Sequence, residues 1–466
     1  MSPADGGKSL LIASERVLVE GELRPAVLRI EGDRIDQVWW GTSDPDAVLR
    51  PVGDMLGATP EDPPEIRRLG DQVVLPGVVD THVHVNEPGR TAWEGFASAT
   101  RAAALGGVTT IVDMPLNSLP PTTTVNALET KRAAAEAVRA RGELHCDVGF
   151  WGGAVPGNTD DLEPLWDAGV FGFKCFLADS GVPEFPPLRP GGLLDAMDRI
   201  ARFGGLMIVH AEDPAALAAA PHASSRAYAD FLLSRPDEAE TTAVAGLLDV
   251  VRETGTRTHV LHVSSARVLD LLKEAKAEGL PVTAETCHHY LVLDAEHIPD
   301  GDAAYKCCPP IRDSGNQDAL WDGLREGILD AVVSDHSPAT AEEKTRGDGD
   351  LQQAWGGISG LQAGFLALAD AARRRGVGLA DVSRWTSAST AALVGLDRGP
   401  RPKGVIAEGA AADLVVYDPE ATTKFRAAEM AHKNKISAYD GLTVQGAVVP
   451  SPISEGSRGR LLRRPA

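Results

Sequence analysis

The strongest constraint on the fold is a regular alternation of short apolar runs and helical stretches through the middle of the chain. Eight runs rich in branched residues follow one another: VVLPGVVDTHVHV (73–85), VTTIVDM (108–114), HCDVGFW (145–151), VFGFKCF (170–176), LMIVHAED (206–213), THVLHVSS (258–265), PVTAETCHHY (281–290) and DAVVSDHSP (330–338). Such alternation predicts parallel strands joined by crossover helices. Eight units indicate an α/β fold with a closed (β/α)8 barrel of the TIM type over residues 73–399. A doubly wound open sheet is the alternative, but no GxGxxG motif follows the first run.

The two ends of the chain have a different pattern. Residues 10–40 contain short strand-like runs that are divided by the turn signals EG and EGDR. A similar texture returns at 403–419 and 441–449. We therefore expect residues 1–72 and 400–466 to build one small β-sandwich domain that the barrel interrupts.

Composition and charge narrow the class of function. The chain has 466 residues and a formal net charge of −21, which argues against binding to nucleic acid or to an anionic membrane. No apolar run approaches membrane-spanning length and the N-terminus lacks the features of a signal peptide, so we expect a cytoplasmic protein. The five cysteines include no CxxC pair, which argues against a disulfide framework or a zinc finger.

Polar residues recur where the predicted strands end. His82 and His84 lie two apart in the first run, so on a strand both imidazoles point to the same side. The fourth, fifth, sixth and eighth runs carry Lys174, His210, His262 and Asp335 near their ends. Active sites of such barrels lie at the C-terminal ends of the strands. A lone histidine there could be a core residue, but six polar residues at one end of the barrel predict a metal site.

The types of side chain indicate the metal and its chemistry. Four imidazoles and one carboxylate suit zinc, with cobalt or manganese as alternatives, and they exceed one tetrahedral site with an open position, so we predict two divalent ions. The apolar neighbours of Lys174 favour a neutral amine, which can add carbon dioxide to give a bridging carbamate (N6-carboxylysine); a lysine that reaches solvent is the alternative. Two ions lower the pKa of a shared water and polarise a carbonyl. Asp335 is predicted to ligate metal and to carry a proton to a leaving nitrogen, so this set suits hydrolysis of an amide or imide bond.

The arrangement of HxH on strand one, lysine on four, histidine on five and six and aspartate on eight resembles the amidohydrolase superfamily. Within it, six stretches are together most similar to the allantoinase branch of the cyclic amidohydrolases: EPGRTAWEGF (87–96), DMPLNSLPPTT (113–123), FWGGAVPGN (150–158), GFKCF (172–176), KCCPPIRD (306–313) and SDHSP (334–338). The resemblance covers nearly the whole chain. It implies hydrolysis of the hydantoin ring of allantoin to allantoate, a step of purine catabolism, by a homotetramer that acts on a small molecule.

Other members of the superfamily remain as alternatives. Dihydropyrimidinase (hydantoinase) is the nearer one, whereas dihydroorotases carry an arginine for the substrate's carboxylate where this chain has Asn86. Non-catalytic relatives, a different functional class, resemble hydrolases that lost metal ligands, and this chain retains all six. In ETCHHY (285–290), His288 stands where related allantoinases often have proline, so we expect His289 to match the family's position and His288 to be structural.

Substrate contacts are predicted near the metal ligands. The amides of Asn86 and Asn117 suit ureido and imide groups, although either could tie a turn. Ser337 is a third predicted contact, because it directly follows Asp335 and His336. The resemblance adds the backbone at Cys287 and at Gly357 in the GGISG turn (356–360).

Two further features concern the mouth of the barrel. Arg90 is expected to pair with Glu87 or Glu94. Residues 339–355 are polar and follow the last metal ligand, which indicates either a mobile loop over the site or a plain solvent-exposed linker.

Overall fold

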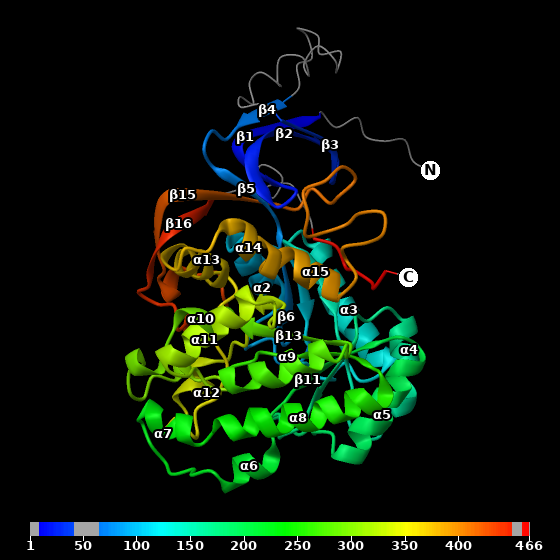
Figure 1. The fold of residues 1–466 in the computed structure, drawn as a ribbon, viewed down its shortest axis with the longest axis vertical. Helices are drawn as coiled ribbons and strands as arrows, with labels where there is room; N and C mark the ends of the chain where they lie inside the picture. The colour runs from blue at the N-terminus through cyan, green and yellow to red at the C-terminus, as the bar shows by residue number, and fades with distance from the viewer. Residues whose placement is uncertain (1–8, 42–64, 450–458, 466) are drawn as a thin grey trace.

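The computed structural model describes residues 9–41, 65–449 and 459–465, and it places the eight predicted strands around a barrel (Figure 1). These strands are β6 (Val78–Val83), β7 (Val108–Asp113), β8 (Asp147–Phe150), β10 (Phe173–Phe176), β11 (Leu206–His210), β12 (Arg257–Val260), β13 (Val282–Cys287) and β14 (Ala331–Val333). Neighbours pair in parallel, and the short β9 (Gly152–Gly153) follows β8 and pairs with β10. A parallel bridge between Val83 and His336 joins β6 to the segment after β14. The predicted (β/α)8 barrel is confirmed.

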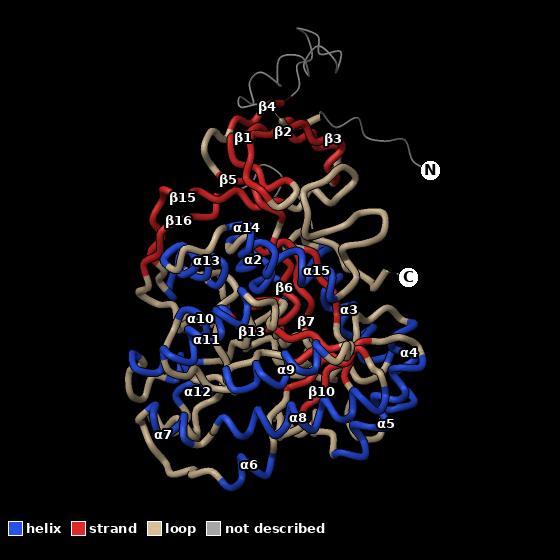
Figure 2. Tube along the Cα trace, viewed as in Figure 1, coloured by secondary structure: helices blue, strands red, loops and turns tan. Residues whose placement is uncertain are grey.

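Helices form the layer outside the strands (Figure 2). They are α2 (Phe96–Leu105), α3 (Val125–Ala140), α4 (Leu162–Asp167), α5 (Pro190–Arg202), α6 (Pro214–Ala219), α7 (Tyr228–Leu233), α8 (Asp237–Thr254), α9 (Leu269–Ala277), α10 (His288–Val292), α11 (Ser314–Arg325), α12 (Ala341–Thr345), α13 (Gly364–Arg374), α14 (Leu379–Ser383) and α15 (Ser389–Leu393). Local sequence sets their ends: the Thr124 side chain accepts a hydrogen bond from Ala127 N–H at the start of α3, and α8 ends at Gly255 with φ 67°. Among the described residues, no helix is long and apolar enough to cross a membrane.

The first apolar run differs from the expectation of one continuous strand over 73–85. It divides into β5 (Val73–Pro76), which pairs with β1 and β15, and β6, which opens the barrel. The break is at Gly77, whose N–H donates to Asp413 O at 2.7 Å. A Cβ at this position would lie 2.1 Å from Thr109 Oγ1, so only glycine fits the turn between the two sheets.

Strands from both ends of the chain form one mixed sheet (Figure 1). Besides β5 it contains β1 (Leu10–Val19), β2 (Glu22–Glu31), β3 (Arg34–Trp40), β4 (Glu65–Arg68), β15 (Leu414–Lys424) and β16 (Thr443–Val449). The order is β16-β15-β5-β1-β2-β3, with β4 also pairing with β1. The barrel therefore carries a second, β-rich domain. The boundaries at 72/73 and 399/400 stay a prediction, and parts of the predicted domain (1–8, 42–64, 450–458 and 466) lie outside the described residues.

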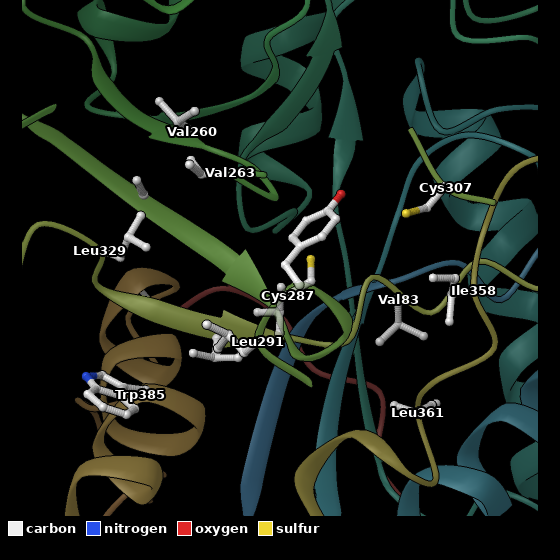
Figure 3. Packing of buried hydrophobic residues seen from close by; sticks show 14 of the residues in the cluster. Val83, Val260, Val263, Cys287, Leu291, Cys307, Leu329, Ile358, Leu361 and Trp385 are labelled. Carbon is white, nitrogen blue, oxygen red and sulfur yellow. The ribbon is translucent and has the colours of Figure 1, made fainter. Parts of the chain in front are cut away.

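The main core fills the space between barrel strands and outer helices. Val260 at the end of β12 and Val263 in the loop after it belong to the same buried cluster as Leu291 of α10 and Trp385 in the helical turn after α14 (Figure 3). Packing on this scale makes the barrel a rigid support for side chains at the strand ends.

Buried ion pairs join the barrel to the β-rich domain. Lys403 Nζ donates to Asp147 Oδ2 of β8 at 2.8 Å and also pairs with Asp413, which precedes β15. Arg401 bridges Asp147, at 2.7 Å, and Asp33 of the β2–β3 turn, at 2.6 Å. These contacts hold the start of β8 against the terminal sheet.

Replacing Lys403 with Met tests this connection. Because the ammonium is buried and neutralises two carboxylates, Lys403→Met should lower the free energy of unfolding by about 3 kcal/mol. Guanidinium or thermal denaturation measures the loss. The matched control is Arg398→Met, since Arg398 is exposed and its pair with Asp397 spans 3.4 Å; it should leave the midpoint unchanged. Equal midpoints for both variants would contradict a role for Lys403 in joining the domains.

Candidate metal centre

The six predicted ligands lie together at the C-terminal ends of the barrel strands. His82 is in β6 and His84 follows it, Lys174 is in β10, His210 ends β11, and His262 and Asp335 each come two residues after a strand. All six are at most 8% exposed. His262 and Asp335 have φ of 36° and 43°, a backbone conformation that residues other than glycine rarely adopt. The backbone is therefore strained where it presents these two side chains.

Three of the ligand atoms surround one point. His82 Nε2 lies 3.2 Å from Asp335 Oδ1, and His84 Nε2 lies 3.5 Å from the same oxygen. The candidate ligand atoms of these residues all lie within 4.8 Å of one another, which suits a shared metal ion. Lys174 Nζ is 3.4 Å from His82 Nε2, so the lysine enters the same cluster from β10.

The remaining imidazoles adjoin this group. The ring of His262 lies 5.4 Å from that of His82 and 4.5 Å from that of His210, measured between ring centroids. Phe176 stacks on His210 at 4.5 Å. His262 Nδ1 is buried without a hydrogen-bond partner among the described residues, so this nitrogen is available to bind a metal ion. All six side chains thus share one cluster.

Glu285 of β13 fixes the tautomer of His82. Its Oε1 accepts a hydrogen bond from His82 Nδ1 at 2.6 Å, and its Oε2 accepts one from His259 Nε2 at 3.0 Å. A carboxylate requires the proton to be on Nδ1, which leaves the lone pair of His82 on Nε2, the atom near Asp335. Glu285 was not among the predicted residues, although a glutamate inside the apolar run VTAETC is an unusual signal.

Glu212 does the same for His210. Its carboxylate accepts from His210 Nε2 at 2.7 Å and pairs with Arg235, so the lone pair of this imidazole is on Nδ1. Burial raises the pKa of Glu212, but Arg235 and His210 outweigh it and bring the pKa to about 2. Sequence analysis missed Glu212 as well; its place two residues after His210 was the available signal.

The charge states suit metal binding at neutral pH. Burial lowers the pKa of His84 to about 3 and lowers the pKa of His210 and His262 in the same direction. Burial would raise the pKa of Asp335, but His82 and the other nearby imidazoles hold it well below its usual range. Neutral imidazoles and an ionised carboxylate are the forms that bind divalent ions.

Asp80 ties the first and last strands together beside the cluster. Its carboxylate accepts hydrogen bonds from His82 N–H at 3.1 Å and from Ser334 N–H at 3.2 Å. Ser334 directly precedes Asp335, so one buried side chain holds the backbone at ligands from β6 and from the end of β14.

Of the predicted substrate contacts, Asn86, Asn117 and Ser337 lie beside the ligands. Asn86 Nδ2 donates to Pro338 O at 3.4 Å, while its Oδ1 is buried without a hydrogen-bond partner in the described part of the chain. Asn117 Nδ2 lies 3.5 Å from His84 Nδ1. Ser337 Oγ donates to Asp335 Oδ1 at 2.8 Å.

The other two predicted contacts offer backbone groups. Gly357 has φ 114°, and a Cβ there would lie 2.2 Å from Ser337 O, so the turn requires glycine to approach Ser337. Cys287 ends β13, and its side chain lies among the buried residues of the core (Figure 3).

The predicted partners of Arg90 are wrong. Arg90 donates to Asn117 O at 3.1 Å and pairs with Glu184, which the loop after β10 brings across the barrel mouth. Glu87 instead accepts from Phe96 N–H at the start of α2, at 2.8 Å. A contact between loops of different strands leaves no trace in local sequence.

Both residues of the His288–His289 pair are buried, and none of their ring nitrogens has a hydrogen-bond partner among the described residues. A Cβ on Gly364 of α13 would lie 2.2 Å from His288 Nδ1, so His288 packs tightly against this helix. That position fits the structural role expected of His288, while the role of His289 stays a prediction.

Residues 339–355 are not a plain exposed linker. Lys344 and Leu351 are buried, and Lys344 Nζ donates to Ala303 O at 3.0 Å. Asp350 accepts from Ser224 Oγ at 2.6 Å. Movement of this loop over the site stays a prediction.

Comparison with known proteins agrees with this geometry. The model of the amidohydrolase family matches residues 73–450. An allantoinase of Streptomyces avermitilis is 52% identical over 98% of both chains, and an allantoinase of Saccharomyces cerevisiae is 43% identical over 94% of this chain and 92% of its own.

Solved structures of the same fold include enzymes for related rings. L-hydantoinase (dihydropyrimidinase) from Arthrobacter aurescens superposes with a TM-score of 0.81 at 28% identity, and dihydropyrimidinase from Brevibacillus agri with a TM-score of 0.83 at 27% identity, each over 98% of both chains. The identity to allantoinases is markedly higher than to either structure. The chain therefore belongs to the amidohydrolase family and, within it, to the group of the allantoinases.

Proposed function

We propose that this chain is a metal-dependent hydrolase that opens the hydantoin ring of allantoin to give allantoate. The observation that carries the proposal is the convergence of His82, His84 and Asp335, whose candidate ligand atoms lie within 4.8 Å of one another at the C-terminal end of the barrel. Relatives that match over nearly the whole chain are allantoinases. Each of the two dihydropyrimidinases is less than 30% identical, which makes this alternative weaker.

The residues present fit two divalent ions. His82 and His84 with Asp335 would hold one, and His210 and His262 the other, because both of these imidazoles are buried and burial lowers the pKa of each, which favours the neutral form. We propose zinc, with cobalt or manganese as alternatives, since imidazole and carboxylate ligands suit all three. When bound, such ions lower the pKa of water and polarise the carbonyl under attack.

Asp335 is the proton carrier in this proposal. Its carboxylate is ionised at neutral pH and is oriented by the Ser337 hydroxyl, which donates to Oδ1 at 2.8 Å. Asp335 takes a proton from water as the new carbon–oxygen bond forms, and returns it to the ring nitrogen as the carbon–nitrogen bond breaks. The second proton of the water stays on the new carboxylic acid and passes to solvent as that group ionises, so the products are a carboxylate and a ureido group with a new N–H bond, and Asp335 ends the cycle ionised.

Uncharged groups are proposed to recognise the substrate. Asn86 Oδ1 is buried and unpartnered among the described residues, so it can accept a hydrogen bond from an imide or ureido N–H without losing an existing partner. Asn117, Ser337 and the backbone at Cys287 and Gly357 supply further donors and acceptors. A neutral Asn86 suits a ring without a carboxylate and disfavours dihydroorotate.

We further propose that Lys174 is carboxylated. Burial lowers the pKa of Lys174 to about 8, partly offset by the negative charges of Asp335 and Glu285, so neutral amine is available near neutral pH. The amine nitrogen bonds to the carbon of carbon dioxide and releases one proton, which leaves an anionic carbamate. That group would supply the cluster with an oxygen ligand. Lys174 Nζ lies 3.4 Å from His82 Nε2, so this oxygen would lie between His82 and the imidazoles of His210 and His262.

The proposal extends to partners and location. The substrate is a small molecule, and a net charge of −21 disfavours nucleic acid and anionic membranes. The homotetramer and the cytoplasmic location implied by resemblance stay predictions.

A substrate panel tests the proposed function. Zinc-loaded protein is assayed with allantoin, hydantoin, dihydrouracil and dihydroorotate. We expect the highest kcat/KM for allantoin and the lowest for dihydroorotate, because Asn86 offers its carboxylate no cation. A preference for hydantoin or dihydrouracil would favour the dihydropyrimidinase alternative, and absence of both bound metal and turnover would favour a non-catalytic relative.

Removing a histidine ligand tests the metal assignment. His82→Ala or His84→Ala should reduce bound metal and lower kcat by at least about 100-fold, because one ion loses a principal ligand. Elemental analysis and activity are measured on the same samples. The control His222→Ala removes an exposed imidazole that bonds only Leu217 O, at 2.7 Å, among the contacts described, and should behave as wild type. Wild-type metal content in His82→Ala would refute the assignment.

Removing Lys174 tests the carbamate. Lys174→Ala should lose at least one ion and most activity, and acetate or propionate should restore both in a concentration- and size-dependent way by filling the vacated space. Lys174→Arg should stay inactive, because a guanidinium does not react with carbon dioxide and repels both ions. Native mass spectra of wild type should show the carbon dioxide adduct with two ions. Chloride at equal ionic strength is the control for charge screening, and full activity of Lys174→Ala without carboxylate would exclude the bridge.

A further inference from the structure

A segment from beyond the barrel packs behind the candidate metal centre. Residues 430–439 follow β15, and they contact both the loop after β6 and the turn at 359–362. The motif HKNK at 432–435 has no part in the proposed chemistry. A series of contacts through Glu94 and His336 nevertheless connects it to two of the proposed ligands.

The first contacts hold the loop that precedes α2. Asn434 Nδ2 donates to Ala92 O at 3.0 Å and to Trp93 O at 2.6 Å. Lys433 donates twice to Glu94: its backbone N–H to Oε1 at 3.1 Å, and its Nζ to the carbonyl oxygen at 3.2 Å. Glu94 is fully buried, and its carboxylate accepts hydrogen bonds from Lys433 N–H and from the Ser98 hydroxyl, while the Lys433 ammonium and the Asn434 amide hold the backbone of the same loop.

Glu94 connects this loop to the ligands through His336. Its Oε2 lies 3.4 Å from His336 Nε2. The ring of His432 also packs against the ring of His336, at 4.9 Å between centroids. His336 directly follows Asp335, and its carbonyl oxygen accepts a hydrogen bond from His84 N–H at 2.8 Å. The position of His336 therefore influences one proposed ligand by a peptide bond and another by a hydrogen bond.

A second contact reaches the turn beside Ser337. Ser437 Oγ donates to Ser359 O at 2.6 Å, and the neighbouring Ile358 O accepts from Ser337 N–H at 3.0 Å. Since Ser337 in turn donates to Asp335, the segment supports that carboxylate from two directions.

We infer that residues 430–439 are a positioning element of the proposed metal centre. Lys433 and Asn434 hold the loop that carries Glu94. Glu94 and His432 pack against the His336 ring, and the backbone of His336 holds His84 and adjoins Asp335. The inference rests on the proposed metal site. Lys433 is exposed and Asn434 half-buried, so their hydrogen bonds add little to global stability, whereas loss of such support typically weakens metal binding or activity 10- to 100-fold, by order of magnitude.

The test compares the double variant Lys433→Met/Asn434→Ala with wild type, both loaded with zinc. We expect zinc to pass to a chelator about 10-fold faster or more, with a similar loss in kcat/KM for allantoin and a thermal midpoint close to wild type. Glu94→Gln keeps the acceptor for Lys433 N–H but removes the charge beside His336, and should also speed release. The conservative variant Lys433→Arg should release zinc as slowly as wild type, because its side chain still offers a donor for the Glu94 carbonyl oxygen.

The matched control is Lys435→Met. Lys435 is also exposed and belongs to the same motif, but its Nζ bonds Met430 O within the segment, so wild-type release is expected. Wild-type release of zinc by the double variant and by Glu94→Gln would overturn the inference, as would a lowered thermal midpoint with unchanged release. Wild-type protein that holds no zinc would instead overturn the proposed function.

Discussion

The geometry of the candidate metal centre depends on the buried carboxylate of Glu285, which two imidazoles share. Burial alone would raise the pKa of Glu285, but His82 and His259 bring it to about 2, so the group stays ionised inside the barrel. An ionised carboxylate in that place is stable only because both oxygens accept short hydrogen bonds, at 2.6 and 3.0 Å. It forces the lone pair of His82 toward Asp335. Without Glu285, the cluster would have the same residues but no defined direction for its first imidazole.

Around this interaction, regular strands give way to strained backbone. Asn86, Asn117, His262 and Asp335 all have positive φ, and all lie at the C-terminal end of the barrel. Each such residue costs free energy that the packed core has to offset, and such conformations concentrate at functional sites. The barrel therefore supplies rigidity in its strands and unusual geometry only where side chains must converge.

The convergence of the six proposed ligands could be predicted from the sequence because each stands at a fixed place relative to an apolar run, and parallel strands bring those places together. Glu285 and Glu212 could not, since a carboxylate's partner depends on which strands are neighbours. The same holds for Arg90, which pairs with Glu184 from another loop, and for the 430–439 segment, which is remote in sequence from the loop it holds. The break at Gly77 could not be predicted because both halves of the run are equally apolar. The strand pairing places the halves in different sheets, and the close approach of Thr109 explains why glycine stands between them.

The division at Gly77 also has a consequence for the order in which the molecule can be assembled. β5 leads directly into β6, the strand that carries His82. Pro76 at the end of β5 pairs with Leu414 of β15, which lies more than 300 residues later in the chain. On the ribosome, most of the barrel emerges before that partner exists. Contacts so distant in sequence form slowly. The strand that leads into the barrel can thus gain its last partner only near the end of synthesis. A chain truncated before β15 would contain every proposed metal ligand and still lack the strand that pairs with β5 along Val73–Pro76.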